Sequence, residues 1–236
     1  MFLVFEFKFD IMFFFTFVRR SKRNLSLLKK SNIHIMIANL TSLSSSNFLV
    51  DLKSRTADSH KKLESLPVSA SIISPDMKLS DYVHYLCLMH DVHKNIENLV
   101  FPLLCNVIDD LNQRKKSHLI EDDLLYLNHN KAVLTPVFNT SEMTVPFALG
   151  VLYVIEGSTL GGRFILKNVT TIPGLENGQG TSYFNGYGEK TGSYWKSFLN
   201  FLEEYNQIYN CTETIIEGAI YAFDSIYNHF ESREKV

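Results

Sequence analysis

Residues 147–166 read FALGVLYVIEGSTLGGRFIL, a run that is apolar on nearly every face and carries only one acid and one base. Thr144, with Pro146 two residues later, is typical of a helix start, because proline is well tolerated in the first turn. A helix that is apolar all round has to be buried among other elements. The stretch therefore predicts the central helix of a helical domain.

Apolar residues recur at helical spacing on both sides of this segment, as expected for amphipathic helices. The pattern predicts further helices over about 48–66, 80–100, 122–130, 189–209 and 213–230, with Pro67 ending the first, Ser80 capping the second and a loop over 173–180. No stretch alternates with a period of two for long enough to form a sheet, and there is neither an internal repeat nor a second core. We expect one all-α domain, a multi-helix bundle over residues 45–232.

The composition excludes several classes of protein. The 236 residues are 45% hydrophobic and 20% charged, which excludes a disordered or collagen-like chain. A formal net charge of -2 provides no basic field for nucleic acid. The three cysteines, Cys87, Cys105 and Cys211, form neither a disulfide framework nor a CxxC site, which favours a reducing, cytoplasmic location.

Residues 1–40 differ from the rest, with seven Lys or Arg against two acids. Glu6, Lys8 and Asp10 interrupt the apolar run, so it is too short for a membrane span of about twenty residues. Its positive charges follow the apolar run, whereas a secretory signal carries them before it. We expect no membrane span here, but a disordered or mis-started extension, with the functional chain beginning near Met36.

Three glycines, Gly157, Gly161 and Gly162, lie within six positions of the central helix. Each glycine inside a helix costs about 1 kcal/mol relative to alanine. Missing Cβ atoms allow a flat ligand or another backbone to approach closely. The spacing alone leaves two interpretations open, a ligand surface or tight helix packing.

His60 lies on the apolar stripe of the first predicted helix. Glu64, four residues later, is within reach of one ring nitrogen, as the hydrogen-bond partner of a metal-binding histidine would be. Lys53, two turns earlier on the same face, is placed to meet an anionic group. The alternative is an exposed His–Glu pair at helical spacing.

Together with the aromatic stretch that follows the loop, these segments resemble a known family. LKSRTADSHKKLE (52–64), YVIEGSTLGGR (153–163) and FNGYGEKTGSYWKSF (184–198) are similar to three signatures of biliverdin-producing heme oxygenases, above all the bacteriophytochrome-associated bacterial branch. The resemblance covers about residues 48–230 and leaves residues 1–40 unmatched.

The resemblance implies an all-α heme oxygenase fold, with heme as both cofactor and substrate between the first helix and the glycine-rich helix. It implies that His60 is the iron ligand, that Glu64 is its partner, that Lys53 and Lys196 meet propionates and that Tyr153 lines the site. Gly157, Ser158, Gly161 and Gly162 would form the catalytic distal wall. Animal enzymes carry an aspartate where this chain has Ser158, so we expect Gly157 and Ser158 to hold a water chain that delivers protons.

The implied reaction needs molecular oxygen and several electrons, and the chain has no flavin or nicotinamide fingerprint. We therefore expect a ferredoxin or similar reductase as donor, and the resemblance implies a bacteriophytochrome as one recipient of biliverdin. Arg114, Lys115 and Lys116 form the densest basic cluster of the body; the cluster is interpreted either as a docking site for an acidic donor or as a solvated turn.

Two other functions stay open: a non-catalytic heme carrier or sensor, and a thiaminase-like hydrolase with a cysteine nucleophile. A ferritin-like di-iron site at His90, His93 and Glu97 is disfavoured, because no Glu-x-x-His pair supports it.

Overall fold

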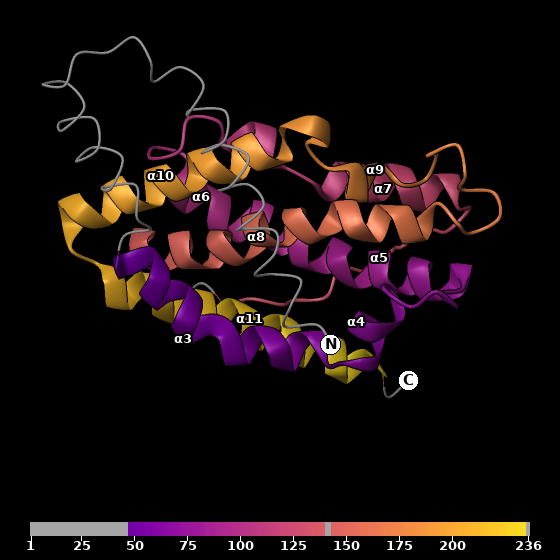
Figure 1. The fold of residues 1–236 in the computed structure, drawn as a ribbon, viewed down its shortest axis with the longest axis horizontal. Helices are drawn as coiled ribbons and strands as arrows, with labels where there is room; N and C mark the ends of the chain where they lie inside the picture. Colours follow the sequence, from indigo (N-terminus) through magenta and orange to yellow (C-terminus); the bar gives the residue numbers. More distant parts are fainter. Residues whose placement is uncertain (1–46, 140–142, 235–236) are drawn as a thin grey trace, which may run out of the picture. The chain divides into compact units, whose positions relative to one another are not determined.

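The computed structural model describes residues 47–139 and 143–234, and all regular structure in them is helical. The expected all-α class is therefore confirmed. The prediction for residues 1–40 lies outside the described residues. The elements are α3 (Asn47–Glu64), α4 (Pro67–Ser71), α5 (Leu79–Asn95), the π-helical turn η2 (Ile96–Val100), α6 (Phe101–Leu104), the 3-10 turn η3 (Leu111–Arg114), α7 (Ser117–Tyr126), α8 (Val145–Val169), α9 (Ser182–Asn185), the 3-10 turn η4 (Gly188–Lys190), α10 (Thr191–Tyr209) and α11 (Thr212–Glu234) (Figure 1).

The helices α8 and α11 form the centre of the fold. A Cβ atom on Gly150 of α8 would collide with the carbonyl oxygen of Ile215, and one on Gly218 of α11 would collide with that of Phe147. These two glycines let the helix backbones approach closely. The expectation that the 147–166 segment forms the central helix is thus met over its N-terminal half, where residues 148–152 are all buried.

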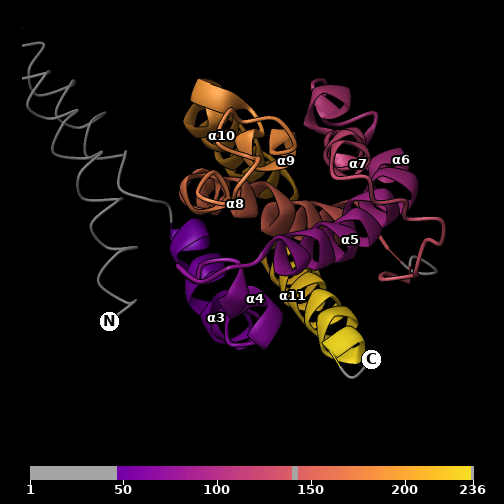
Figure 2. The ribbon, with the colours of Figure 1, turned by 90° about the vertical axis from the view of Figure 1, so that its right-hand side faces the viewer.

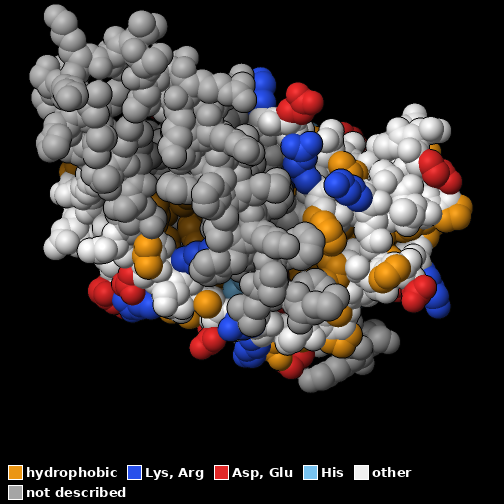
Figure 3. Space-filling view, viewed as in Figure 1, with side chains coloured by type: hydrophobic (Ala, Val, Ile, Leu, Met, Phe, Trp, Pro, Cys, Tyr) orange, Lys and Arg blue, Asp and Glu red, His pale blue; other side chains and the backbone are white. Residues whose placement is uncertain are grey.

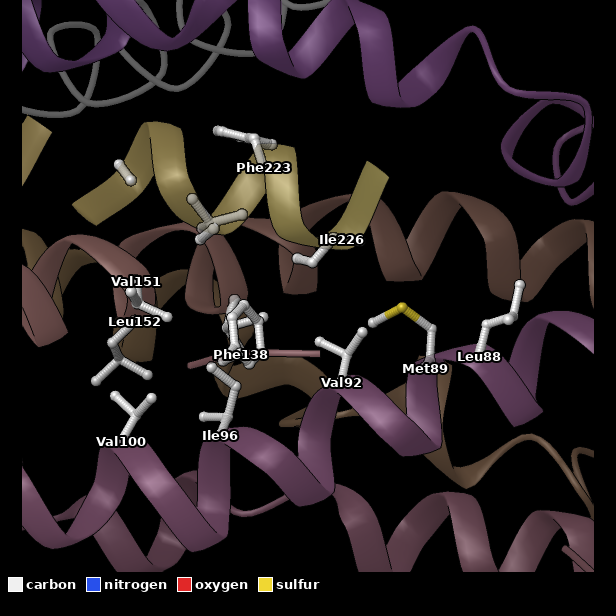
Figure 4. Packing of buried hydrophobic residues seen from close by; sticks show 14 of the residues in the cluster. Leu88, Met89, Val92, Ile96, Val100, Phe138, Val151, Leu152, Phe223 and Ile226 are labelled. Atoms are coloured by element: carbon white, nitrogen blue, oxygen red, sulfur yellow. The ribbon is translucent and has the colours of Figure 1, made fainter. Parts of the chain in front are cut away.

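The core extends from this pair to α5. Val92 of α5 and Ile96 of η2 point toward Phe138 and toward Ile226 of α11, and Val100 points toward Leu152 of α8 (Figure 4). The helix α11 also packs against α3, so it contacts both α3 and α8 (Figures 1 and 2). The helix with His60, α3, and the helix with the three glycines, α8, therefore both pack against α11.

The length and composition of α8 would also suit a membrane span. Half of its most apolar stretch is buried inside the described structure. The core helix of a globular domain can have the same length and composition as a membrane span. Its role here is that of a core helix.

The first helix ends just before Pro67, as predicted, but two predicted helix starts were wrong. Pro67 does not only end α3; it opens α4 as its first residue, a position that proline favours. Ser80 is not the N-cap of α5, which begins at Leu79; Asp81 instead accepts a hydrogen bond from the Lys78 backbone N–H at 3.0 Å.

The second wrong start is that of α7, which was expected over 122–130 and begins at Ser117. Its start is fixed by Glu97 from η2, whose Oε1 accepts the backbone N–H groups of Lys116 and Ser117, both at 2.8 Å. The sequence near Ser117 does not reveal this cap, because the carboxylate comes from another part of the chain.

Candidate functional site

The α3 stripe that carries His60 faces α11. Leu52 and Thr56 are buried on it, and the Thr56 hydroxyl donates to the Leu52 carbonyl at 2.8 Å, so no polar group is left unpaired. His60 follows Thr56 by one turn but leaves the core, with 38% of its side chain exposed. The stripe thus ends in an accessible imidazole.

The surroundings of His60 combine one apolar and one acidic contact. Its ring lies 5.4 Å from the ring of Phe223 on α11. Its Nε2 lies 3.4 Å from Oε1 of Glu64, which is itself largely exposed. Lys53 is exposed on the same helix. The imidazole therefore has a carboxylate near one ring nitrogen, an arrangement that is common among metal-binding histidines.

The glycines of α8 differ in what surrounds them. A Cβ atom on Gly161 would meet no atom within 4 Å, and one on Gly157 would only reach ordinary contact with the Trp195 ring, at 3.5 Å. On Gly162 it would lie 3.3 Å from the Phe184 carbonyl oxygen. Packing inside the described chain therefore accounts for Gly162, as it does for Gly150, but not for Gly157 or Gly161.

The α8 surface around Gly161 is apolar and exposed. Leu160 is 40% exposed and Phe164 is 56% exposed, and both lie within one turn of Gly161. Over the C-terminal half of α8, apolar side chains lie beside basic ones on the molecular face in Figure 3; Arg163 and Lys167 are the exposed bases there. Such a surface suits a flat apolar ligand with anionic groups.

The remaining predicted site residues lie as follows. Tyr153 is half-buried, with its ring 5.5 Å from that of Trp195 on α10. Ser158 is exposed, and its hydroxyl donates to the Ile155 carbonyl at 2.7 Å. Lys196 is exposed on α10.

The structure groups these residues around two elements. Tyr153 and Gly157 meet at Trp195, whereas His60, Glu64 and Lys53 lie on α3. The helices α3 and α8 make little or no direct contact, although each packs against α11. The imidazole and the glycine segment are therefore held by a common support rather than by each other.

The polar group that the sequence reasoning missed is Glu156, directly before Gly157. Its side chain is 2% exposed and forms an ion pair with Arg114, whose Nη1 lies 2.5 Å from Glu156 Oε2. The Tyr187 hydroxyl donates to Glu156 Oε1 at 2.8 Å. Burial raises the pKa of Glu156, while Arg114 and the Tyr187 hydroxyl oppose that rise. An acid inside an otherwise apolar run was the available signal.

This pairing corrects the interpretation of the basic cluster 114–116. Arg114 and Lys116 are both 3% exposed. These two residues therefore form no part of a docking surface or of a solvated turn. Burial, acting against nearby acids, lowers the pKa of Lys116 to about 8. Only Lys115 of the three is exposed.

Other kinds of site receive little support from the described residues. No group of three or more His, Cys, Asp or Glu side chains that could hold a metal occurs among them. His90, His93 and Glu97 pair instead with Glu121, Tyr183 and the Lys116–Ser117 backbone. Burial raises the pKa of the Cys87 and Cys211 thiols, which is the opposite of nucleophile activation.

Comparison with known proteins identifies a family and a similar fold. A family model described as heme oxygenase matches residues 46–232. Among solved structures, the fold is similar to that of the NO- and CO-bound heme oxygenase from Neisseria meningitidis, with a TM-score of 0.64 and 22% sequence identity over 79% of this chain and 94% of that chain. No curated protein matches the sequence.

Proposed function

Because the chain belongs to the heme oxygenase family, we propose that it cleaves heme to biliverdin, carbon monoxide and ferrous iron, using dioxygen and external electrons. Heme is the substrate as well as the cofactor, and its iron supplies the chemistry with dioxygen when it is bound. The observation that carries the proposal is the glycine pair Gly157 and Gly161, which packing inside the described chain does not require.

The residues of α3 suit the side of the substrate that binds iron. His60 would hold the iron through one ring nitrogen, and Glu64 would accept the N–H of the other, which fixes the tautomer and raises the basicity of the ring. In the present rotamer Nε2 of His60 lies 3.4 Å from Oε1 of Glu64. Lys53 and Lys196 offer cations to the propionates.

The glycine segment suits the opposite face. Bare backbone at Gly157 and Gly161 would let a flat ring lie against the helix, Gly162 packs against Phe184 of α9, and Tyr153 with Trp195 would close the apolar wall. The side chains of residues 157–162 contain no ionisable group. Protons therefore arrive through water, which the Gly157 carbonyl and the lone pairs of the Ser158 hydroxyl oxygen hold in place.

The first test is optical. Hemin is titrated into the wild-type protein and into His60→Ala, with His84→Ala as the matched control, because His84 is an exposed histidine on α5. We expect wild type and the control to share one Soret spectrum and the His60 variant to lose it. An unaltered spectrum in the His60 variant would remove His60 as the ligand.

The second test adds a ferredoxin–reductase system to the hemin complex. We expect the Soret band to give way to biliverdin absorption. Hemin binding without ring opening would instead identify a heme carrier, the alternative left open by the sequence.

The same proposal extends to partners and location. The donor is a ferredoxin or similar reductase, and the site of action is the cytoplasm, where the three cysteines, free in the structure, stay reduced. From the resemblance to the bacteriophytochrome-associated branch we further propose a phytochrome as recipient of the biliverdin. The test is to mix an apo-phytochrome with the reaction product and to look for the absorption spectrum of the assembled phytochrome.

A further inference from the structure

A buried polar cluster lies behind the glycine segment, on the side of α8 that faces η3 and η4. Its centre is the Arg114–Glu156 ion pair, in which both side chains are 2% exposed. Arg114 also donates from Nε and Nη2 to the two carboxylate oxygens of Asp110, both at 2.8 Å. The guanidinium is thus held by two carboxylates, through different nitrogen atoms.

The cluster joins α8 to three other elements. Tyr187, which donates to Glu156, stacks on Tyr194 of α10 with ring centroids 4.1 Å apart and an interplanar angle of 2°. The ammonium of Lys116 also lies over the Tyr187 ring, 3.4 Å from its centroid. A shift of Glu156 along or around the α8 axis would therefore disturb contacts in η3, η4 and α10 together.

The glycine segment, residues 157–161, is held mainly at its ends. Glu156 is the last buried residue before it and Gly162 the first after it. At the Gly162 end the contact is with the Phe184 backbone and ring. At the Glu156 end the hold is ionic and directional, and such a pair tolerates displacement less well than apolar packing, which has no preferred direction.

We propose that Glu156, Arg114 and Tyr187 are positioning residues that set the height and rotation of the glycine segment over the substrate. The proposal rests on the proposed function, because it assigns that segment to the face where the ring is attacked. None of the three residues touches the substrate; they act through the α8 backbone. A misplacement of about 1 Å at a reacting centre can cost about a hundredfold in rate, so a rigid hold at this point has a large effect.

The test uses Glu156→Gln and Tyr187→Phe, which keep the shape of each side chain, and Asp91→Asn as the matched control. Asp91 is also 2% exposed and also pairs with a cation, Lys131 at 2.9 Å, but it faces the 131–135 segment instead of α8. All three variants are expected to unfold at a lower temperature. Only the two variants in the cluster are expected to change the glycine segment.

Two readouts separate positioning from general stability. In the substrate-free protein, amide hydrogen exchange over residues 157–163 should become at least tenfold faster in Glu156→Gln than in Asp91→Asn. In the hemin complex, the C–O stretching frequency of added carbon monoxide and the ratio of biliverdin isomers should shift in the two cluster variants alone. Unchanged exchange and an unchanged frequency in Glu156→Gln, with a lowered melting temperature, would overturn the proposal.

Failure of the proposed function would look different. A wild-type protein that binds hemin without opening the ring would contradict ring cleavage, whereas the exchange rate and the carbon monoxide frequency would still report whether the cluster positions the segment.

Discussion

A single methyl group added at position 161 should affect protein stability and substrate binding in opposite directions. Gly161→Ala adds a Cβ atom that meets nothing within 4 Å, in an exposed part of α8. Alanine is favoured over glycine inside a helix by about 1 kcal/mol, so we expect the substrate-free protein to become more stable by roughly that amount. The same methyl group would press on a flat ligand, so hemin affinity and turnover should fall at least tenfold.

Denaturant titration and hemin titration of the same samples check this pair of effects. Gly150→Ala is the control, because its Cβ atom would collide with the Ile215 carbonyl oxygen and overpacking typically costs about 1–3 kcal/mol. A Gly161→Ala protein that binds and cleaves heme normally would remove the glycine segment from the site.

The glycines also show where prediction from the sequence stops. The spacing of Gly157, Gly161 and Gly162 predicted close approach of some flat group or backbone. Only the structure separates Gly162, which packs against Phe184, from Gly161, at which an added Cβ atom would meet no described residue within 4 Å. The residues that decide this lie in α9 and α10, far along the chain, so no local pattern contains the information.

Ser158 tests the route of the protons. Its hydroxyl already donates to the Ile155 carbonyl at 2.7 Å, so it can only accept from a water. Ser158→Ala should slow biliverdin formation while hemin affinity stays nearly the same, since the hydroxyl supplies no iron ligand and no apolar surface. Single-turnover rates measured against hemin dissociation constants check this, and an unchanged rate would exclude the hydroxyl from the mechanism.

At the scale of elements, Asn95 fastens the extended segment 131–139 to α5. Its side-chain amide donates to the Thr135 carbonyl at 3.0 Å and accepts the Val137 N–H at 3.1 Å. Both hydrogen bonds are partly buried, and a typical hydrogen bond within a protein contributes about 0.5–1.5 kcal/mol. We therefore expect Asn95→Ala to lower the free energy of unfolding by about 1–3 kcal/mol for the two hydrogen bonds together.

Urea denaturation measures that loss, and hydrogen exchange of residues 131–139 locates it. Asn200→Ala is the control, because Asn200 is exposed on α10. Equal stabilities of the two variants would show that the segment is held by its apolar contacts, such as buried Phe138, instead.

The same scale shows which elements the sequence could predict. The long helices α3, α8, α10 and α11 were expected within a few residues, because each has an apolar stripe or an apolar body of its own. The start of α7 was not, since Glu97 of η2 supplies its cap. The basic turn before it was misread because Glu156, the more deeply buried of the two acids that pair with Arg114, is 42 residues away. Periodicity reports which face is buried, but not which distant charge is buried with it.

For the whole molecule, a modest net charge of -2 conceals charged and titratable groups inside the fold. His93 is 2% exposed, next to Tyr183, and burial, with Lys116 and His90 acting in the same direction, lowers its pKa to about 3. An unfolded histidine titrates near about 6.5. Between these two pKa values the unfolded chain binds one proton more than the folded chain at this residue.

Asp91 acts in the same direction at lower pH. Burial tends to raise its pKa, but contacts with His229, the Thr135 N–H and Lys131 outweigh burial and bring it to about 2. An unfolded aspartate titrates near about 3.9, so the stability that Asp91 contributes is present above that pH and is lost as the pH falls toward 2. Acid therefore weakens the fold first through His93 and then through Asp91.

The free energy of unfolding should accordingly fall as the pH is lowered from 7 to 4.5, and one proton contributes a slope of about 1.4 kcal/mol per pH unit. His93→Gln removes the group that must stay neutral in the fold, so its slope should be shallower than that of wild type by nearly that amount, whatever its stability at pH 7. Urea denaturation at half-unit pH steps measures both slopes. His84→Gln, at an exposed position on the same helix, should reproduce the wild-type slope. Parallel curves for wild type and His93→Gln would mean that water reaches His93 and protonates it in the folded protein.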